Sequence, residues 1–345
     1  MNPYKSQPER AFWRKSVGSR HYAELSDMWR PMPLKKADMI ATAGSCFAQH
    51  IGKNLAIRGA DFMDLEPAPP VFNSEAEARR WGYGVYSCRY GNLYTSRQLV
   101  QLFDEAHGTR LPSEPVWEKT GRFFDSLRPG IDPVGQDDAE SILALRRVHL
   151  EAVRRMFSEL DVFVFTMGLT EGWEATADGT MFPVAPGTIA GTYVPGNYRL
   201  RNLRAADIRA DMEGFWERLR SVNPKARMLL TVSPVPLAAT ATDNHVLVAT
   251  TYSKSVLRSV AGELSEDHPD IYYFPSYEII ASHPARGMFF EPDLRNVNPF
   301  GVNYVMGHFF SGDLAKEFGS VLPAKDDDDI ELICEEGQLD EEANR

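Results

Sequence analysis

The chain has 345 residues, of which 43% are hydrophobic and 25% are charged, and its formal net charge is −11. This balance is typical of a globular protein and excludes a disordered or fibrous chain. No apolar run reaches the ~18 residues that a membrane span needs, so we expect no integral membrane association. Predicted strands and helices then alternate along the sequence.

Strands are predicted at residues 38–43, 161–168, 226–232 and 271–274, and helices at 46–58, 139–160, 205–222, 246–264 and 299–318. In the helix at 139–160 we expect Leu145 and Val148 to belong to the buried apolar stripe. Residues 180–194 are interrupted by Pro and Gly and are predicted to form a hairpin or loop insertion. The alternation indicates an α/β fold whose parallel sheet is covered on both faces.

Charge and composition divide the chain into three parts. Residues 1–37 are predicted to form an extension that packs on the domain, and residues 38–320 to form that domain. Residues 321–345 are an acidic tail, since ten acidic and two basic residues lie between Lys325 and Arg345. The remaining sequence has no feature of a nucleic-acid-binding surface, so we expect no nucleic-acid partner.

The cysteine content favours a reducing compartment. Cys46, Cys88 and Cys334 are odd in number and scattered, which argues against a disulfide framework. The polar start of the chain has no apolar segment of a secretory signal, so we expect a cytoplasmic protein. No metal-ligand spacing and no glycine-rich phosphate-binding motif is present, and we therefore predict neither a metal nor a cofactor.

Ser45 is the first candidate for chemistry, because it follows a predicted strand and opens a predicted helix. In parallel sheets, ligands bind at the carboxyl ends of the strands. We expect the Ser45 hydroxyl to face an open hollow there, as a nucleophile. A helix N-cap is an alternative role for this serine. Cys46 could be nucleophilic at a helix start, but neighbouring helical residues face different ways, and we expect Cys46 to be buried.

Residues 44–48 read GSCFA, and several later segments accompany them: residues 90–95 (YGNLYT), 166–173 (TMGLTEGW), 231–235 (TVSPV), 252–254 (YSK) and 273–278 (YFPSYE). In this order the segments resemble the GSCFA family, which is similar to the SGNH (GDSL-like) hydrolase superfamily of esterases and acyltransferases. The resemblance implies a three-layer α/β/α sandwich with a mostly parallel, flavodoxin-like sheet. It also implies Ser45 as the nucleophile.

The resemblance further implies an oxyanion hole formed by the backbone N–H groups of Ser45 and Gly91 and by the Asn92 amide. Thr170 stands where related hydrolases place an asparagine, and its hydroxyl could donate one hydrogen bond. Glu171 could orient a loop or a substrate hydroxyl, or could be a structural acceptor. The aromatic stretch at residues 81–94 would suit a wall that faces a sugar, or could pack in the core.

The chain departs from the superfamily pattern near the last helix. That pattern places an Asp and a His three residues apart, where the His is the general base and the Asp orients it. Here Asp293 is followed by Asn296 instead of His. We therefore predict His283 as the base, oriented by Asp293 or Glu278. His245 is an alternative base.

These features predict a serine-dependent hydrolase or O-acyltransferase that acts on a carbohydrate or polysaccharide ester through an acyl-enzyme. Its partner would be a small-molecule or carbohydrate ester substrate. The carbohydrate preference rests on the family resemblance alone. The missing Asp-x-x-His pattern favours a different class, a non-catalytic descendant that binds a glycan or a protein partner. Both readings remain open at the level of sequence.

Overall fold

A five-stranded parallel sheet forms the centre of the molecule. The computed structural model describes residues 2–25, 27–319 and 335. The strands are β1 (Met39–Gly44), β2 (Asp61–Phe62), β5 (Val162–Met167), β9 (Arg227–Val232) and β10 (Ile271–Phe274), in the order β10-β9-β5-β1-β2. Every pair in this sheet is parallel. Counted in chain order, the strands follow the 2-1-3-4-5 order of flavodoxin-like sheets, as predicted.

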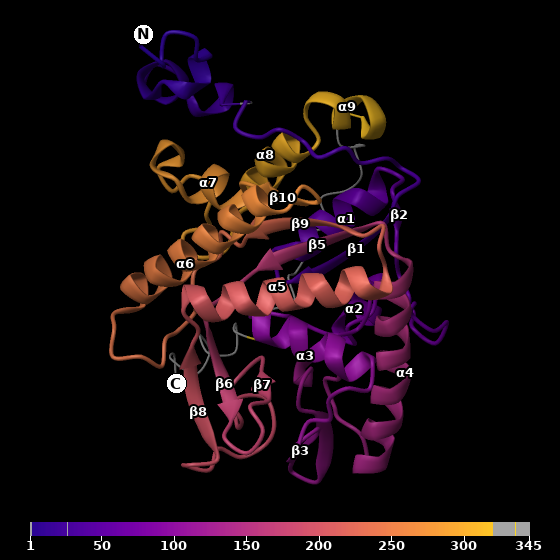
Figure 1. Cartoon of the computed structure of the whole chain (residues 1–345). Coiled ribbons are helices and arrows are strands. Elements are labelled where there is room, and N and C mark those ends of the chain that lie inside the picture. The colour runs from indigo at the N-terminus through magenta and orange to yellow at the C-terminus, as the bar shows by residue number, and fades with distance from the viewer. Residues whose placement is uncertain (1, 26, 320–334, 336–345) are drawn as a thin grey trace.

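Helices cover both faces of the sheet (Figure 1). One core contains residues of α3 (Ser96–Ala106), α4 (Ala139–Glu159), α5 (Ala205–Val222) and α6 (Val246–Asp267). The other contains residues of α1 (Ala48–Ile57), α7 (Ser276–Ala281), α8 (Pro299–Phe309) and α9 (Gly312–Phe318). Successive residues of β5 enter opposite cores, since Phe163 and Phe165 join the first and Val162 and Val164 the second. The three-layer α/β/α sandwich is confirmed.

Two smaller sheets and some short elements complete the described fold. β3 (Val116–Lys119) and β4 (Arg122–Asp125) form a hairpin, and β6 (Glu171–Ala175) lies between β7 (Met181–Phe182) and β8 (Tyr198–Asn202). Trp117 and Phe182 share a core between them. The remaining described elements are α2 (Glu75–Arg80) and the helical turns Glu9–Ala11, Arg14–Gly18, Tyr22–Glu24, Pro129–Ile131 and His283–Ala285. The predicted insertion at 180–194 contains β7.

Two details of the predicted helices were wrong. The helix expected at 299–318 is divided into α8 and α9 by a break at Phe310 and Ser311, and Gly312, the first residue of α9, has a φ of +58°. In α4, Leu145 and Val148 are exposed, at 44% and 63% of their surface. The buried positions of α4 include Arg146 and His149 instead. The buried stripe of this helix therefore carries charge, which an apolar pattern does not detect.

The segment before β1 lies along the domain. Trp29 is buried against Phe274 and Phe309, with ring centroids 4.7 and 5.3 Å apart. Met32 and Leu34 are also buried. The predicted acidic tail at 321–345 lies outside the described residues, except for Glu335. Among the helices that the structure describes, none is both long and apolar enough to cross a membrane.

Candidate functional site

A sharp turn at Gly44 connects β1 to Ser45. Gly44 has a φ of +131°, and a Cβ atom there would lie 2.2 Å from the Thr166 carbonyl oxygen. Only glycine fits this close approach of two strands. The Ser45 N–H donates to the same Thr166 oxygen at 3.0 Å. This backbone N–H is therefore used by the sheet, and the expectation that it lines an oxyanion hole was wrong for this arrangement.

The Ser45 side chain is covered. Ser45 is 3% exposed, and its Oγ is buried without a hydrogen-bond partner. The loop after β5 closes over it, since a Cβ atom on Gly168 would lie 3.0 Å from the Ser45 Cβ. Gly168 and Leu169 both donate their N–H groups to the Tyr94 carbonyl, which joins this loop to the segment before α3. Within the described residues the Ser45 hydroxyl faces no open hollow, because these two segments meet above the serine.

Helix α6 holds the loop after β5 in place. Lys254 is fully buried, and its Nζ donates to the Gly168 carbonyl at 2.7 Å. The Thr170 N–H donates to Ser253 Oγ at 3.0 Å. The Thr170 hydroxyl, predicted to face the substrate, donates instead to Asn202 Oδ1 at 2.7 Å. Its hydrogen is therefore already engaged within the fold.

Asn92 lies beside the turn that carries Ser45, because the Leu93 N–H donates to the Gly44 carbonyl at 2.9 Å. The Tyr86 hydroxyl donates to Asn92 Oδ1 at 2.5 Å. This contact fixes the amide so that its Nδ2 hydrogens point the other way. Gly91 has a φ of +69°, which glycine adopts without strain. Of the predicted oxyanion donors, the Asn92 amide thus has a fixed direction, with its Nδ2 toward Glu335 Oε2 at 3.4 Å.

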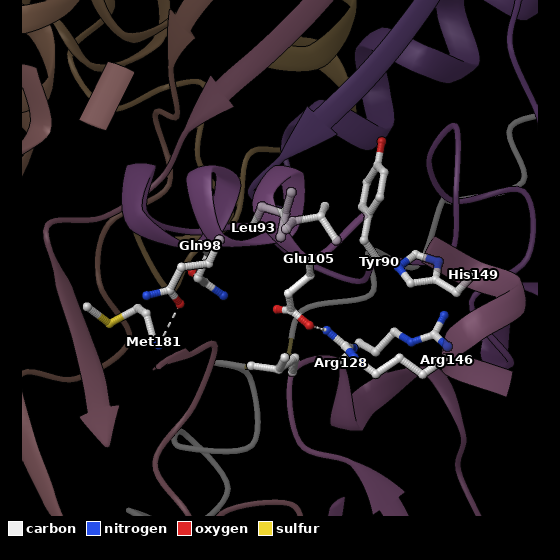
Figure 2. A pocket seen from close by; sticks show the side chains of 11 residues that line it. Tyr90, Leu93, Gln98, Glu105, Arg128, Arg146, His149 and Met181 are labelled. Atoms are coloured by element: carbon white, nitrogen blue, oxygen red, sulfur yellow. Dashed lines mark hydrogen bonds and ion pairs between the residues drawn. The ribbon is translucent and has the colours of Figure 1, made fainter. Parts of the chain in front are cut away.

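A buried charged cluster anchors this loop at Arg89. Glu66 accepts the Arg89 N–H at 2.6 Å and contacts His149 Nδ1 at 2.6 Å. Arg128 donates to the Arg89 carbonyl at 2.9 Å and to Asp125 at 2.7 Å. Both polar groups of the Arg89 backbone are thus held by buried side chains. Arg128 and His149 line a cavity of about 20 Å³, which has room for one water molecule. Their side chains are labelled in Figure 2.

The pKa values in this cluster follow from burial and charge. Burial, with the Arg128 charge, lowers the pKa of His149 to about 4, so the ring is neutral at pH 7 and donates from Nδ1 to Glu66. Burial alone would raise the pKa of Glu66, but His149 and Arg128 lower it to about 2. The Asp125 pKa is also lowered to about 2, because Arg146 and Arg128 outweigh the burial. Both carboxyls are charged at neutral pH.

The predicted base and its partner lie apart from these residues. His283 is exposed and stacks on Trp13, with ring centroids 5.3 Å apart. Asp293 accepts hydrogen bonds from the Asn296 N–H and side chain, within its own loop. In the described ranges, no hydrogen bond or ion pair joins His283 to Asp293, or either residue to Ser45. The alternative base His245 accepts the Leu247 N–H at the start of α6.

Two residues near Ser45 in sequence belong to the interior. Cys46 is 4% exposed and packs in the core with Phe47 and Ile51, as expected. His50 is buried, and neither ring nitrogen has a partner. Burial and the nearby charges of Arg79 and Lys53 lower its pKa to about 4.

Glu171 and the aromatic stretch have structural contacts. Glu171 accepts a hydrogen bond from the Thr240 hydroxyl at 2.8 Å and so holds the loop before α6. Tyr86, Tyr90 and Tyr94 are each 2% exposed, and their rings pack in the core. The alternative of an exposed aromatic wall is therefore wrong for these three residues.

Sequence reasoning did not single out Lys254 for the site. Its signal is its position on the buried stripe of α6, three and seven residues before Leu257 and Ala261. A lysine on an otherwise apolar stripe is seldom fully buried without a specific partner. In the structure Lys254 donates to the carbonyl of Gly168, the residue that lies against Ser45.

The sequence model of the GSCFA family matches residues 39–309. The chain belongs to the GSCFA family. The match in this GSCFA chain includes the Ser45 turn, the Asn92 loop and Lys254, as well as His283 and Asp293. No curated protein matches the chain.

Proposed function

We propose that this GSCFA protein is a serine-dependent acyl-ester hydrolase or O-acyltransferase with Ser45 as its nucleophile. The observation that carries the proposal is the Ser45 Oγ, which lies at the carboxyl end of the central strand β1 and is buried without a hydrogen-bond partner. An unsatisfied buried hydroxyl costs about 1–3 kcal/mol. Such groups are uncommon and call for an explanation, and a reactive role for this oxygen supplies one.

The strand order and the position of the serine support the resemblance to SGNH hydrolases. Ser45 follows the first strand of a 2-1-3-4-5 sheet, at the edge where ligands bind in open parallel sheets. The carbohydrate or polysaccharide ester that we propose as substrate rests on the resemblance. The buried free thiols of Cys46 and Cys88 support the cytoplasm as the compartment, because thiols there stay reduced.

In the proposed reaction the Ser45 oxygen bonds to the ester carbonyl carbon, and the carbonyl electron pair moves to its oxygen. The Asn92 amide and the Gly91 N–H would donate hydrogen bonds to this oxyanion. The serine proton passes to a base and then to the departing alcohol as the carbon–oxygen bond breaks. Water, or a second hydroxyl, releases the acyl group by the reverse sequence.

His283 remains our proposal for the base, although its ring now stacks on Trp13. It can accept the serine proton only after the loop at 282–298 moves toward Ser45. We assign Lys254 a positioning role, because its ammonium holds the Gly168 carbonyl against the serine. If His283 is the base, His283→Ala should lower ester turnover by about 10²–10⁴-fold, whereas His245→Ala should leave it unchanged. Full activity in His283→Ala would exclude this base.

A second candidate function is a non-catalytic protein that binds a glycan or a protein partner. Specific observations favour it: the Ser45 N–H is engaged with Thr166, and no described contact brings a histidine to the Ser45 oxygen. In this case Ser45 serves only the turn between β1 and α1. The two functions differ in whether the serine oxygen reacts.

A fluorophosphonate probe separates the two functions, since it phosphonylates reactive serines. We expect covalent labelling of the wild-type chain, with complete loss in Ser45→Ala. Cys46→Ala is the matched control, because it removes the neighbouring nucleophile and leaves the turn intact. It should be labelled like the wild type. A folded wild-type protein that takes up no probe would favour the binding function.

A further inference from the structure

Glu335, a residue of the acidic tail, is buried beside the candidate site. It is 4% exposed although it carries a carboxylate. The Asn92 Nδ2 donates to its Oε2 at 3.4 Å. Carboxylates are seldom buried without specific partners. One partner here is the Asn92 amide, whose Oδ1 accepts from the Tyr86 hydroxyl on its other side.

Two glycines form the slot that holds this carboxylate. A Cβ atom on Gly91 would lie 3.2 Å from Glu335 Oε1, and one on Gly130 would lie 2.8 Å from its Cγ and 2.9 Å from Oε1. An alanine Cβ at Gly130 would clash with Glu335 and push its carboxylate away, whereas a Cβ at Gly91 would require a shift of only a few tenths of an ångström. The floor of the slot is near Arg128, whose Cβ is 3.6 Å from the same point on Gly91. The slot is therefore about as large as a carboxyl group, and the Asn92 amide donates a hydrogen bond into it.

The slot is part of the Ser45 region. The Leu93 N–H donates to the Gly44 carbonyl, next to Ser45. The carbonyl of the following residue, Tyr94, accepts hydrogen bonds from the loop that covers Ser45. The Gly91 and Asn92 donors are those that we propose for the oxyanion. A carboxylate and an ester share the planar O–C–O group, so the same donors can bind either.

We propose that the slot formed by Gly91, Asn92 and Gly130 is a carboxylate-binding subsite that the protein's own Glu335 fills. Glu335 thereby competes with the acyl group of a substrate for the Asn92 amide donor. The competition rests on the proposed function, whereas the carboxylate subsite does not.

The test uses the full chain and two ways to expel the carboxylate. Glu335→Ala removes it, and Gly130→Ala fills the slot from the other side at a position whose φ is not left-handed. Glu336→Ala is the matched control, since it removes the same charge one residue later. Hydrogen exchange, read by mass spectrometry, reports the amides at 89–95 and 130–132. We expect about tenfold faster exchange there in both slot variants, and wild-type rates in the control.

Sodium acetate provides a second readout, with sodium chloride as the control for ionic strength. Acetate should restore slow exchange in Glu335→Ala and should have no effect in Gly130→Ala, where the slot is filled. Unchanged exchange in Glu335→Ala, or an equal change in Glu336→Ala, would overturn the subsite.

Fluorophosphonate labelling then tests the competition. We expect about tenfold faster labelling of Ser45 in Glu335→Ala than in the wild type. Equal or slower labelling in Glu335→Ala would overturn the inhibitory role of Glu335. Faster exchange without labelling of any variant would support the subsite and refute Ser45 as the nucleophile, so the two failures are distinguishable.

Discussion

Arg146 is the residue whose loss should damage the fold most clearly. Its guanidinium bonds to both oxygens of Asp125 at 3.0 Å and pairs with Glu105, and all three side chains are at most 6% exposed. Breaking a buried ion pair by removing one partner typically costs 3–5 kcal/mol, because a buried charge is left uncompensated. We therefore expect Arg146→Met to lower the free energy of unfolding by about 3–5 kcal/mol at pH 7, measured by urea denaturation.

The same substitution on the exposed face of α4 is the control. Arg155 pairs with Glu159 one turn later, with 63% and 42% of these side chains exposed. Such surface pairs contribute about 0.3–0.5 kcal/mol, so Arg155→Met should have little effect. Burial raises the pKa of Glu105, so the deficit of Arg146→Met should shrink as the pH falls from 7 to 5. Equal effects of the two substitutions would refute the account of the cluster.

Three further outcomes follow from the described contacts. Burial lowers the pKa values of His50 and His149 to about 4, whereas these rings bind protons below about pH 6.5 in the unfolded chain. The free energy of unfolding should therefore fall between pH 6.5 and pH 4, by on the order of 3 kcal/mol per ring. A urea midpoint that stays constant over this range would contradict the burial of the rings. Gly168→Ala should cost about 1–3 kcal/mol by crowding Ser45 and should abolish probe labelling, whereas Gly307→Ala, with open space around it, should do neither. Ser45→Ala should raise the unfolding free energy by about 1 kcal/mol, since it removes an unsatisfied hydroxyl, and a loss of stability in calorimetry would count against that reading.

Four of the five strands of the central sheet could be predicted from the sequence because each is a short, mostly apolar run, whereas the two-residue β2 was not predicted. Residues 162–167 are buried on both faces, so their pattern does not depend on distant contacts. The buried stripe of α4 could not be predicted in this way. Arg146 can be buried there because Asp125 neutralises its charge, and His149 because Glu66 accepts its hydrogen bond. Both acidic residues lie outside α4. The partners of a buried charge are set by tertiary structure.

The place of Ser45 was also predictable, since a strand that runs into a helix directs the intervening residue to the sheet edge. Its surroundings were not. The cover over its oxygen depends on Gly168 and Tyr94, which are 74 residues apart and meet through backbone hydrogen bonds. The contact of Glu335 with Asn92 spans 243 residues. A local sequence pattern does not encode contacts between residues so far apart in the chain. The short motifs that contain these residues could nevertheless be recognised in the sequence.

The most direct test of the central claim is to trap the acyl-enzyme. The wild type and Glu335→Ala would be incubated with p-nitrophenyl acetate, quenched in acid and mapped by peptide mass spectrometry. The account predicts an acetyl group on the Ser45 hydroxyl, more abundant in Glu335→Ala and absent from Ser45→Ala. Folded proteins that carry no acetyl group in either form, or that carry it on Cys46, would contradict Ser45 as the nucleophile.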